Sequence, residues 1–538
     1  MGGFVAIATL AGCNDSSDFD ISQQIGPDPV LPDPNPPLVA NMKVAEVVGW
    51  ADGETPTVPD GLSVTAYAQD LANPRALHTL PNGDVLVIQA RGPSGEPVSR
   101  PKDIIRGWIM SIAHGGGGGE KKPSDLITLL RDTNRDGEVD ERHDLLTDLN
   151  SPFGVAWADG TLYVANTDAI LAYPYELGAN EITADPTVLT PLPGGPIDHH
   201  WTKDLALGPE GRFLYASVGS NSNIMENGLE AEKGRAAIWQ VDRRTGASRV
   251  FASGLRNPNG LTFHPETGAL WTVVNERDEL GPNLVPDYMT SVKDGGFYGW
   301  PWSYYGNHVD ARVRPKRPDM VEQAIAPDYA LSSHVAPLGM TFAMASALPA
   351  DYRSGAFVGE HGSWNRTFFN GYKVVYIPFQ EGAPSGKAQD VVTGFIDGDE
   401  AHGRPVGVGI DGTGALLVAD DAGNTVWRVA AADGSVTDAP IGTDRVSADT
   451  SSSFDTATSS AASPARTDSS AAATPAPDSG ASQASQGARP SSDELLTGQA
   501  PVTTSQGSGG GTRPSQTDIA PAVLPSETGA SDGQANER

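Results

Sequence analysis

The side chains best suited to chemistry stand at equivalent places along the chain, each just before an apolar run. They are the pair His199 and His200, the pair Arg256 and Asn257, and Arg404. A neutral imidazole removes protons near neutral pH, and a fixed guanidinium stabilises negative charge that develops on oxygen. A histidine at the start of a strand also packs without a chemical role, so the residues alone leave both interpretations of His200 open.

A second candidate is an acidic loop of the calcium-binding type. Asp132, Asn134, Asp136 and Asp140 follow the pattern Asp-x-Asn-x-Asp-Gly-x-x-Asp, which places a glycine at the sharp turn. The twelfth position is His143 rather than the usual bidentate Glu. The loop predicts a structural Ca²⁺ site, and an acidic turn between sheets is the alternative.

Residues so far apart need a scaffold that gathers them, and the chain contains a repeat that can do so. A loop with Pro or Gly, an alternating apolar strand, a turn and a second apolar strand recur six times, with first strands near residues 73–77, 151–155, 200–205, 256–261, 337–342 and 403–408. One hairpin cannot bury its own face, so the units must pack on one another. The pattern predicts an all-β fold, a six-bladed β-propeller, in which residues before the first strands meet at one mouth of the central channel.

Composition divides the chain into four parts. The propeller is expected over residues 44–432, after a signal segment (1–13) and a polar, Pro-rich stretch (14–43) that predicts an extended tether. Residues 433–538 are mostly Ser, Ala, Thr, Pro, Gly and Asp. Such a tail buries too little apolar surface to offset the entropy of ordering, so we expect it to be disordered.

The single cysteine suggests a location. Cys13 ends a short apolar run in the order Leu-Ala-Gly-Cys, which resembles a bacterial lipobox. We expect a lipid-anchored protein on the periplasmic face of a bacterial membrane, and Asn14 favours the outer membrane. No Lys or Arg precedes the run, which departs from a signal peptide, and an ordinary buried cysteine is the alternative. This run is too short to span a membrane as a helix, and no other stretch is long and apolar enough, so we expect contact with the membrane only through the anchor.

The charge balance excludes one class of partner. The 67 acidic residues outnumber the 36 basic ones, which gives a net charge of −31. Such a surface repels phosphate backbones, so no nucleic acid partner is expected.

Several motifs, taken in order, resemble the soluble quinoprotein glucose, aldose-sugar and sorbosone dehydrogenases. The motifs lie at 198–200, 254–260, 275–282, 295–301, 362–366 and 403–407, and the last two resemble the sorbosone branch in particular. The resemblance covers about residues 60–430. It implies oxidation of an aldose sugar or a sorbosone-like aldehyde with pyrroloquinoline quinone (PQQ) and Ca²⁺, and electron transfer to a periplasmic acceptor.

The resemblance also implies roles for single residues. It makes His200 the general base and places Arg256 and Asn257 against the reactive quinone carbonyl. His199 stands where the glucose-oxidising members have an acidic residue, so Asp198 or a backbone carbonyl is expected to orient the base. The remaining candidates hold cofactors: Arg404, Arg366 and His361 for the quinone carboxylates, and the backbone carbonyls of Gly281 and Pro282 for Ca²⁺.

Two other functions stay open. A Ca²⁺-dependent lactonase-type hydrolase needs several acidic side chains before the first strands, where this chain has histidine and arginine. A non-catalytic surface propeller fits the anchor and the tail, but it gives no reason for the arrangement of His200, Arg256 and Arg404.

Overall fold

The structure is a computed structural model that describes residues 19–36, 42–93, 124–195, 199–343 and 346–437. The predictions for Cys13, Asp198 and nearly all of the tail concern residues outside these ranges. The described residues are almost entirely strands, turns and loops; the helical elements are α2 (Pro318–Val321), η1 (Ile21–Gln24), η2 (Leu229–Glu232) and η3 (Ala350–Tyr352). No helix among them is long and apolar enough to cross a membrane.

Each predicted hairpin is an antiparallel strand pair. Period-two apolar alternation and turns such as the one at Gly83, whose φ of +94° suits glycine, set these pairs locally. The pairs are β4 (Pro74–Thr79) with β5 (Val85–Gln89), β8 (Gly154–Ala158) with β9 (Thr161–Ala165), β12 (Leu205–Leu207) with β13 (Phe213–Val218), β16 (Pro258–Phe263) with β17 (Leu270–Val274), β22 (Pro337–Phe342) with β23 (Gly355–Glu360), and β29 (Pro405–Ile410) with β30 (Leu416–Asp420).

Further strands widen each hairpin into a sheet. They are β6 (Leu126–Arg131) and β7 (Glu141–Leu146), β10 (Ala169–Pro174) and β11 (Thr187–Pro191), β14 (Ala237–Asp242) and β15 (Ser248–Ser253), β18 (Pro286–Ser291) and β21 (Tyr329–Ser333), and β24 (Lys373–Gln380) with β25 (Ala383–Pro384) and β26 (Gln389–Val392). Two small sheets lie outside this series: β19 (Ser303–Tyr304) with β20 (His308–Val309), and β2 (Glu46–Val47) with β28 (Glu400–Ala401) and β27 (Ile396–Asp397).

The last sheet of the series takes its fourth strand from the N-terminal end of the domain. Strand β3 (Leu62–Ala68) pairs with β31 (Thr425–Ala431), so that Leu62 lies opposite Ala431, and the sheet order is β29-β30-β31-β3. Because the next strand along the chain, β4, begins the first sheet, this pairing links the first sheet to the last.

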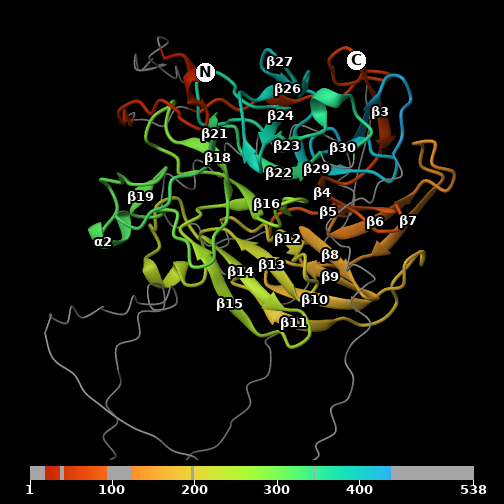
Figure 1. The fold of residues 1–538 in the computed structure, drawn as a ribbon, viewed down its shortest axis with the longest axis horizontal. Helices are drawn as coiled ribbons and strands as arrows, with labels where there is room; N and C mark the ends of the chain where they lie inside the picture. Colours follow the sequence, from red (N-terminus) through yellow and green to blue (C-terminus); the bar gives the residue numbers. More distant parts are fainter. Residues whose placement is uncertain (1–18, 37–41, 94–123, 196–198, 344–345, 438–538) are drawn as a thin grey trace, which may run out of the picture. The chain divides into compact units, whose positions relative to one another are not determined.

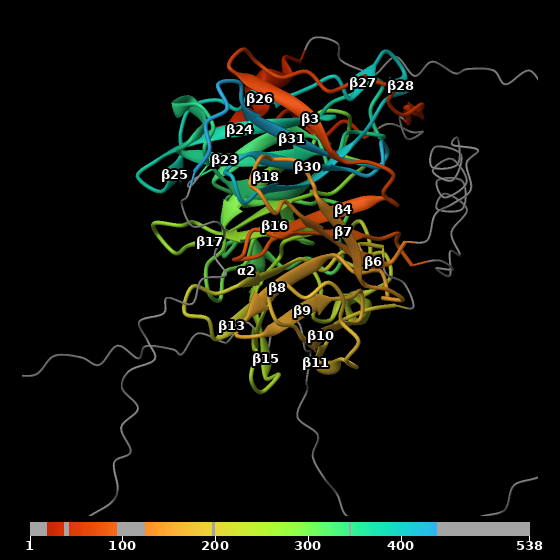
Figure 2. The same ribbon diagram turned by 90° about the vertical axis from the view of Figure 1, so that its right-hand side faces the viewer.

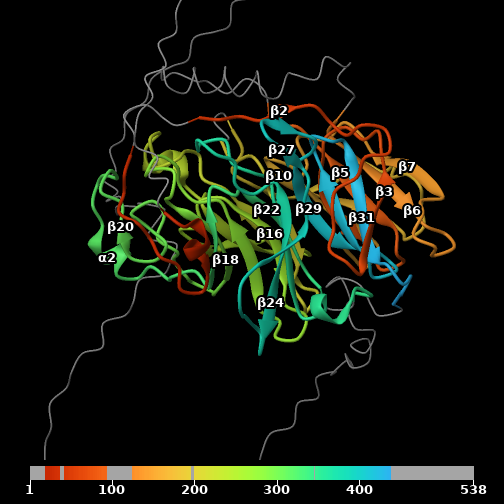
Figure 3. The same ribbon diagram turned by 90° about the horizontal axis from the view of Figure 1, so that it is seen from above.

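The first strands of the sheets form a closed ring. Strands β4, β8, β12, β16, β22 and β29 each contact the next, and β29 contacts β4. In Figure 1 these strands lie inward, whereas strands such as β7, β11 and β15 lie outward. Figure 2 shows the sheets of β31, β4 and β8 one after another, and Figure 3 shows β16, β22 and β29 side by side. Sheets arranged in this way around an axis are the pattern of a β-propeller.

The stretch expected to be a tether contacts the domain at several of its described residues. Strand β1 (Ile25–Gly26) adds to the edge of β21, with Ile25 opposite Leu331. The side chain of Gln24 is fully buried. Proline-rich composition favours extended backbone, but an extended backbone also fits a sheet edge, which is why composition alone indicated a tether.

Candidate active site

A polar cavity of about 190 Å³ collects the residues at the mouth of the ring. His199, His200, Arg256 and Asn257 line it, as predicted from their positions before the first strands. The other residues that line it come from the loop after β17, from β18, from the loop before β22 and from the loop after β23: Asn275, Glu276, Asp278, Asp287, His334, Ala336, Trp364 and Asn365.

The orientation of His200 is set by a neighbouring carbonyl. Nδ1 of His200 lies 2.9 Å from the backbone oxygen of Ser220 and 2.9 Å from its Oγ. The Ser220 hydroxyl donates to the Ser222 carbonyl at 2.7 Å, so its oxygen is an acceptor toward the imidazole. A carbonyl only accepts, so Nδ1 carries the hydrogen, and Nε2 of the neutral ring is the basic nitrogen. Asp198 or a backbone carbonyl was expected to orient the base, and the structure shows a backbone carbonyl, that of Ser220, in this position.

Arg256 forms the floor of the cavity rather than projecting into it. Its guanidinium donates to the carbonyls of Asn223, Asn275 and Glu276, to Asn223 Oδ1 at 3.0 Å and to Asp278 Oδ2 at 3.1 Å. These five hydrogen bonds match the five N–H donors of a guanidinium. Its positive charge faces the cavity, but a direct hydrogen bond to a ligand requires one of these contacts to open.

A chain of hydrogen bonds connects Arg256 to the loop predicted to bind Ca²⁺. Asp278 Oδ1 accepts from Asn365 Nδ2 at 2.6 Å, and the same nitrogen lies 3.0 Å from His334 Nδ1. His334 Nε2 donates to the Gly281 carbonyl at 3.2 Å. Burial lowers the pKa of His334 to about 4, so the ring is neutral at neutral pH and fits this pattern of donors and acceptors.

Two further carboxyl groups lie deep in the cavity wall. Both oxygens of Asp287 accept backbone N–H groups, from Glu276 and from Ala336 at 2.8 Å each. Burial raises the pKa of Asp287 to about 8 and that of Glu276 to about 7. These acidic side chains do not stand before first strands: Glu276 follows β17 and Asp287 lies in β18.

The three residues predicted to hold quinone carboxylates do not line this cavity. Arg366 is fully buried and donates to the Ser333 carbonyl at 3.0 Å and to Asn283 Oδ1 at 2.9 Å. His361 Nε2 lies 3.1 Å from both oxygens of Asp421. Arg404 lies near the same carboxylate and holds its guanidinium 5.6 Å from the Tyr372 ring.

Asp421 is the centre of a small cationic cluster. Arg75 forms an ion pair with it, and the Arg75 guanidinium lies 5.6 Å from the ring of Trp201, the residue after His200. Burial opposes ionisation of Asp421, but His361, Arg75 and Arg404 outweigh it and hold the pKa of the carboxyl well below its usual range.

Unpartnered polar atoms test whether the cavity and the cluster around Asp421 suit a polar, anionic ligand. Within the described residues, Nε and Nη2 of Arg404, Nε of Arg75 and Oδ1 of Asn257 are buried without a hydrogen-bond partner. Buried polar groups normally find partners, so such atoms are expected where a ligand or water supplies them. Arginine N–H groups suit a ligand with several carboxylates, and an amide oxygen suits a hard cation; both kinds of group are present.

The acidic loop between β6 and β7 folds on its own hydrogen bonds. Asp132 accepts the backbone N–H groups of Arg135 and Gly137 at 2.6 and 2.8 Å, and Asp140 accepts that of Thr133 at 2.7 Å. Over the ranges that the structure describes, no group of three or more His, Cys, Asp and Glu side chains is placed to hold a metal ion. Calcium binding at Asp132, Asn134, Asp136 and Asp140 stays a prediction.

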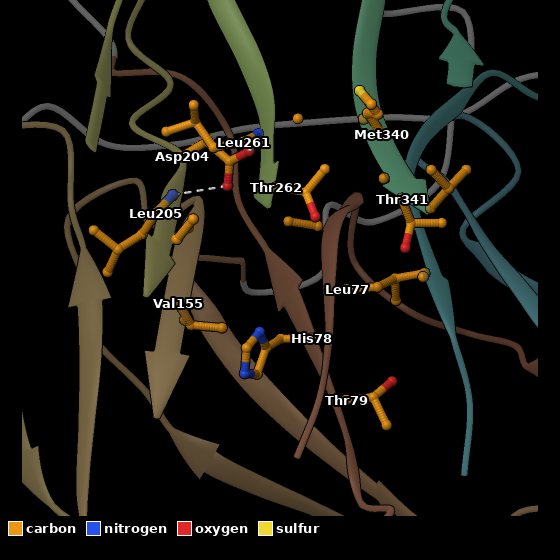
Figure 4. Close-up of a pocket in the computed structure, with 18 of the residues that line it drawn as sticks. Leu77, His78, Thr79, Val155, Asp204, Leu205, Leu261, Thr262, Met340 and Thr341 are labelled. Carbon is orange, nitrogen blue, oxygen red and sulfur yellow. Dashed lines mark hydrogen bonds between the residues drawn. The ribbon is translucent and has the colours of Figure 1, made fainter. Parts of the chain in front are cut away.

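A larger cavity, of about 260 Å³, lies among the first strands themselves (Figure 4). Its wall mixes apolar side chains with His78 and Asp204. Asp204 accepts the N–H groups of Leu205 and Leu261 at 2.8 and 2.7 Å, and burial raises its pKa to about 6. None of the predicted site residues lines this cavity, so we assign the chemistry to the smaller one.

A closed ring of antiparallel sheets is the architecture of a β-propeller, and the polar cavity lies among residues that precede three of its first strands. The comparisons with known proteins agree. The chain belongs to the TrAA12-like family, whose model matches residues 126–290 and 317–432.

Proteins with related sequences come from Borreliella burgdorferi and Coprinopsis cinerea. An uncharacterized protein of Borreliella burgdorferi is 28% identical over 294 residues, which cover 52% of this chain and 76% of that protein. The pyrroloquinoline quinone-dependent pyranose dehydrogenase of Coprinopsis cinerea is 28% identical over 227 residues, which cover 34% of this chain and only 30% of that protein.

Solved structures share the fold. A calcium structure of the Trichoderma reesei family AA12 enzyme superposes with a TM-score of 0.57 at 19% identity and covers 72% of this chain and 98% of its own. The holo form of the PQQ domain of the Coprinopsis cinerea pyranose dehydrogenase gives a TM-score of 0.56 at 20% identity and covers 72% and 100%. The family and these dehydrogenase relatives confirm the predicted enzyme class, an oxidoreductase, and the relatives carry the predicted PQQ and calcium. Assignment to a sorbosone-like branch stays a prediction.

Proposed function

We propose that this protein oxidises an aldose sugar or a sorbosone-like aldehyde with bound PQQ and Ca²⁺, and that its six large sheets are six propeller blades. The observation that carries the proposal is the tautomer of His200. Its Nδ1–H is fixed by the Ser220 carbonyl, and the ring lines a cavity that also contains Arg256 and Asn257. A basic nitrogen beside a buried cation is what oxidation of an alcohol or lactol requires.

In this proposal each residue has a limited task. PQQ, when bound, would supply the oxidising chemistry at the substrate carbon. His200 Nε2 takes the proton from the substrate oxygen, and the Ser220 carbonyl stabilises the imidazolium that results. The buried guanidinium of Arg256 provides a positive potential in the same cavity, which favours negative charge there.

The cationic cluster is the best candidate for binding the quinone carboxylates. Arg404 has two N–H groups without partners, and Arg75 and His361 lie around the same Asp421. Arg366 ranks below Arg404 for direct contact in this conformation, since its Nη1 and Nη2 donate within the protein. Calcium would be held by oxygen atoms of the loop with Gly281 and Pro282, where the Gly281 carbonyl is at present bonded to His334.

Location and electron transfer belong to the proposal as well. The lipobox at Cys13 supports attachment to the periplasmic face of a membrane, where a periplasmic acceptor would take the electrons. Fatty-acid labelling tests this directly: the natural chain should be labelled and sediment with membranes, whereas Cys13→Ala should not be labelled. A natural chain found entirely in the cytoplasm would end the idea.

Reconstitution tests the reaction. The purified chain should be incubated with PQQ and Ca²⁺ and tested for dye reduction with aldoses, osones and simple alcohols. We expect quinone-dependent reduction with at least one sugar or osone. Binding of quinone without turnover of any of them would place the substrate in another class.

A lactonase-type hydrolase is the second candidate, because Glu276, Asp278 and Asp287 line the same cavity. It ranks lower since Asp278 is paired with Arg256 and both oxygens of Asp287 accept backbone groups. Lactone hydrolysis by the chain with Ca²⁺ and without quinone would favour it.

A further inference from the structure

The N-terminal strap, defined here as residues 19–36, is built into the wall behind the candidate active site. Figure 3 shows this red segment beside β18, and strand β1 within it pairs with β21. Asn35 at its far end donates its N–H to the Leu280 carbonyl at 2.8 Å. The strap therefore contacts the loop that contains Gly281 and Pro282 as well as the edge of the sheet.

Gln24 closes a hydrogen-bonded ring of four buried residues. Its Nε2 donates to the Asn283 carbonyl at 2.5 Å, and its Oε1 accepts from Ser333 Oγ at 2.7 Å. Arg366 contacts the same two residues: Nη1 donates to the Ser333 carbonyl at 3.0 Å and Nη2 donates to Asn283 Oδ1 at 2.9 Å. All four residues are at most 7% exposed, so water does not compete for these bonds.

The three members of the ring other than Gln24 stand next to residues of the site. Asn283 follows Gly281 and Pro282 directly, Ser333 precedes His334, and Arg366 follows Trp364 and Asn365. The ring thus fixes three loops relative to one another: the candidate calcium loop, the end of β21, and the loop after β23.

The strap lies so close to the candidate calcium loop that position 281 requires a glycine. Gly281 has φ +116°, and a Cβ at this position would lie 2.9 Å from the Asn35 carbonyl oxygen. A side chain would strain the backbone and push the strap away. The contact with Gly281 is therefore part of how this loop is shaped.

The residues that follow the strap also contact segments close to the site residues Trp364 and Arg404. Lys43 donates its N–H to the Trp364 carbonyl at 2.9 Å, and its ammonium lies 4.5 Å from the ring of Phe369. Trp50 donates to Asp420 Oδ2 at 2.7 Å, and Oδ1 of the same carboxylate accepts the backbone N–H of Arg404 at 2.7 Å.

We propose that the strap is a positioning element of the active site and that Gln24 is its key residue. Gln24 holds the loop with Gly281 and Pro282 in the geometry that binds the cofactors, and it acts through Asn283 and Ser333 rather than by touching a ligand. The cofactor part of this inference rests on the proposed function; the ordering of the loop does not.

The test compares Gln24→Leu with its neighbour Gln23→Ala in the full chain. Gln23 is the matched control because its side chain is exposed whereas that of Gln24 is fully buried. Hydrogen exchange of the peptide over residues 279–285 is measured without quinone, and the PQQ Kd is then measured in excess Ca²⁺. Losing two buried hydrogen bonds should speed exchange and raise the Kd, each about tenfold, and Gln23→Ala should change neither.

Two more variants keep the result decisive. Ser333→Ala removes only the hydroxyl that bonds Gln24, and it should give a smaller change in the same direction if Gln24→Leu fails to fold. Ile127→Val deletes one methylene from the core around β6 and controls for general instability.

The two proposals fail separately. Unchanged exchange at residues 279–285 in both Gln24→Leu and Ser333→Ala overturns the positioning role, whatever the quinone does. An equal rise in Kd for Ile127→Val also overturns it. A natural chain that binds no PQQ, while its Gln24→Leu variant still loosens the loop, overturns the proposed function and leaves the strap intact.

Discussion

The ion pair between Arg256 and Asp278 should be the strongest single energetic link in the site. Arg256 Nη2 lies 3.1 Å from Asp278 Oδ2, and the side chains are 3% and 14% exposed. Removing one partner of a buried pair costs about 3–5 kcal/mol, because the other charge is left in a poorly solvated place. The partial exposure of Asp278 argues for the lower end, about 3 kcal/mol, for Arg256→Met, and for less with the isosteric Asp278→Asn.

A double-mutant cycle measures this link. Equilibrium unfolding in guanidinium chloride should show that Arg256→Met with Asp278→Asn is more stable than the sum of the single changes by about 1–3 kcal/mol. Arg256→Lys should not rescue, since an ammonium has three donors where the guanidinium uses five. Additive single effects, within about 0.5 kcal/mol, would refute the coupling and with it the floor of the cavity as described.

Three further predictions concern the base, a buried acid and the tail. His200→Ala should lower dye reduction about 10²- to 10⁴-fold with little change in quinone affinity, and His199→Ala should matter less; the opposite order would mean that the base is misassigned. Burial raises the pKa of Glu360 to about 8, above its ordinary value of 4.5. The protonated form is therefore favoured by folding, and the stability it contributes is present at low pH and lost as pH rises through about 8. Glu360→Gln should flatten the decline in Tm between about pH 4.5 and pH 8; an equally steep decline would contradict the assignment. Removing the residues after about 440 should leave Tm and dye reduction nearly unchanged, and a large fall in Tm would show that the tail packs on the domain.

The hairpins could be predicted from the sequence because their causes are local. Alternation along the strands and turn residues such as Asn82 and Gly83 act within a few positions. The pairing of β3 with β31 joins residues 62–68 to 425–431 and leaves no local pattern. Packing of the strap was missed for the same reason, since Gln24 finds its partners Asn283 and Ser333 hundreds of positions away.

The candidate site likewise contains residues that the sequence could predict and residues that it could not. His200, Arg256 and Asn257 were found because they precede first strands, and His334, which stands three residues before β22, was available to the same rule but was missed. Asp278 and Asn365 lie inside motifs that had been noted only for resemblance. The orientation of Arg366 and His361 depends on distant partners, Asn283 and Asp421, which sequence spacing does not reveal.

Direct binding of PQQ is the measurement that tests the central claim most closely. The purified chain should be titrated with quinone in excess Ca²⁺ while the quinone absorbance is followed, with Arg404→Ala alongside. We expect saturable, Ca²⁺-dependent binding of one quinone per chain, weakened in Arg404→Ala because two unpartnered N–H groups are lost. No absorbance shift at about 100 μM quinone, far above the Kd expected for a resident cofactor, would contradict the account.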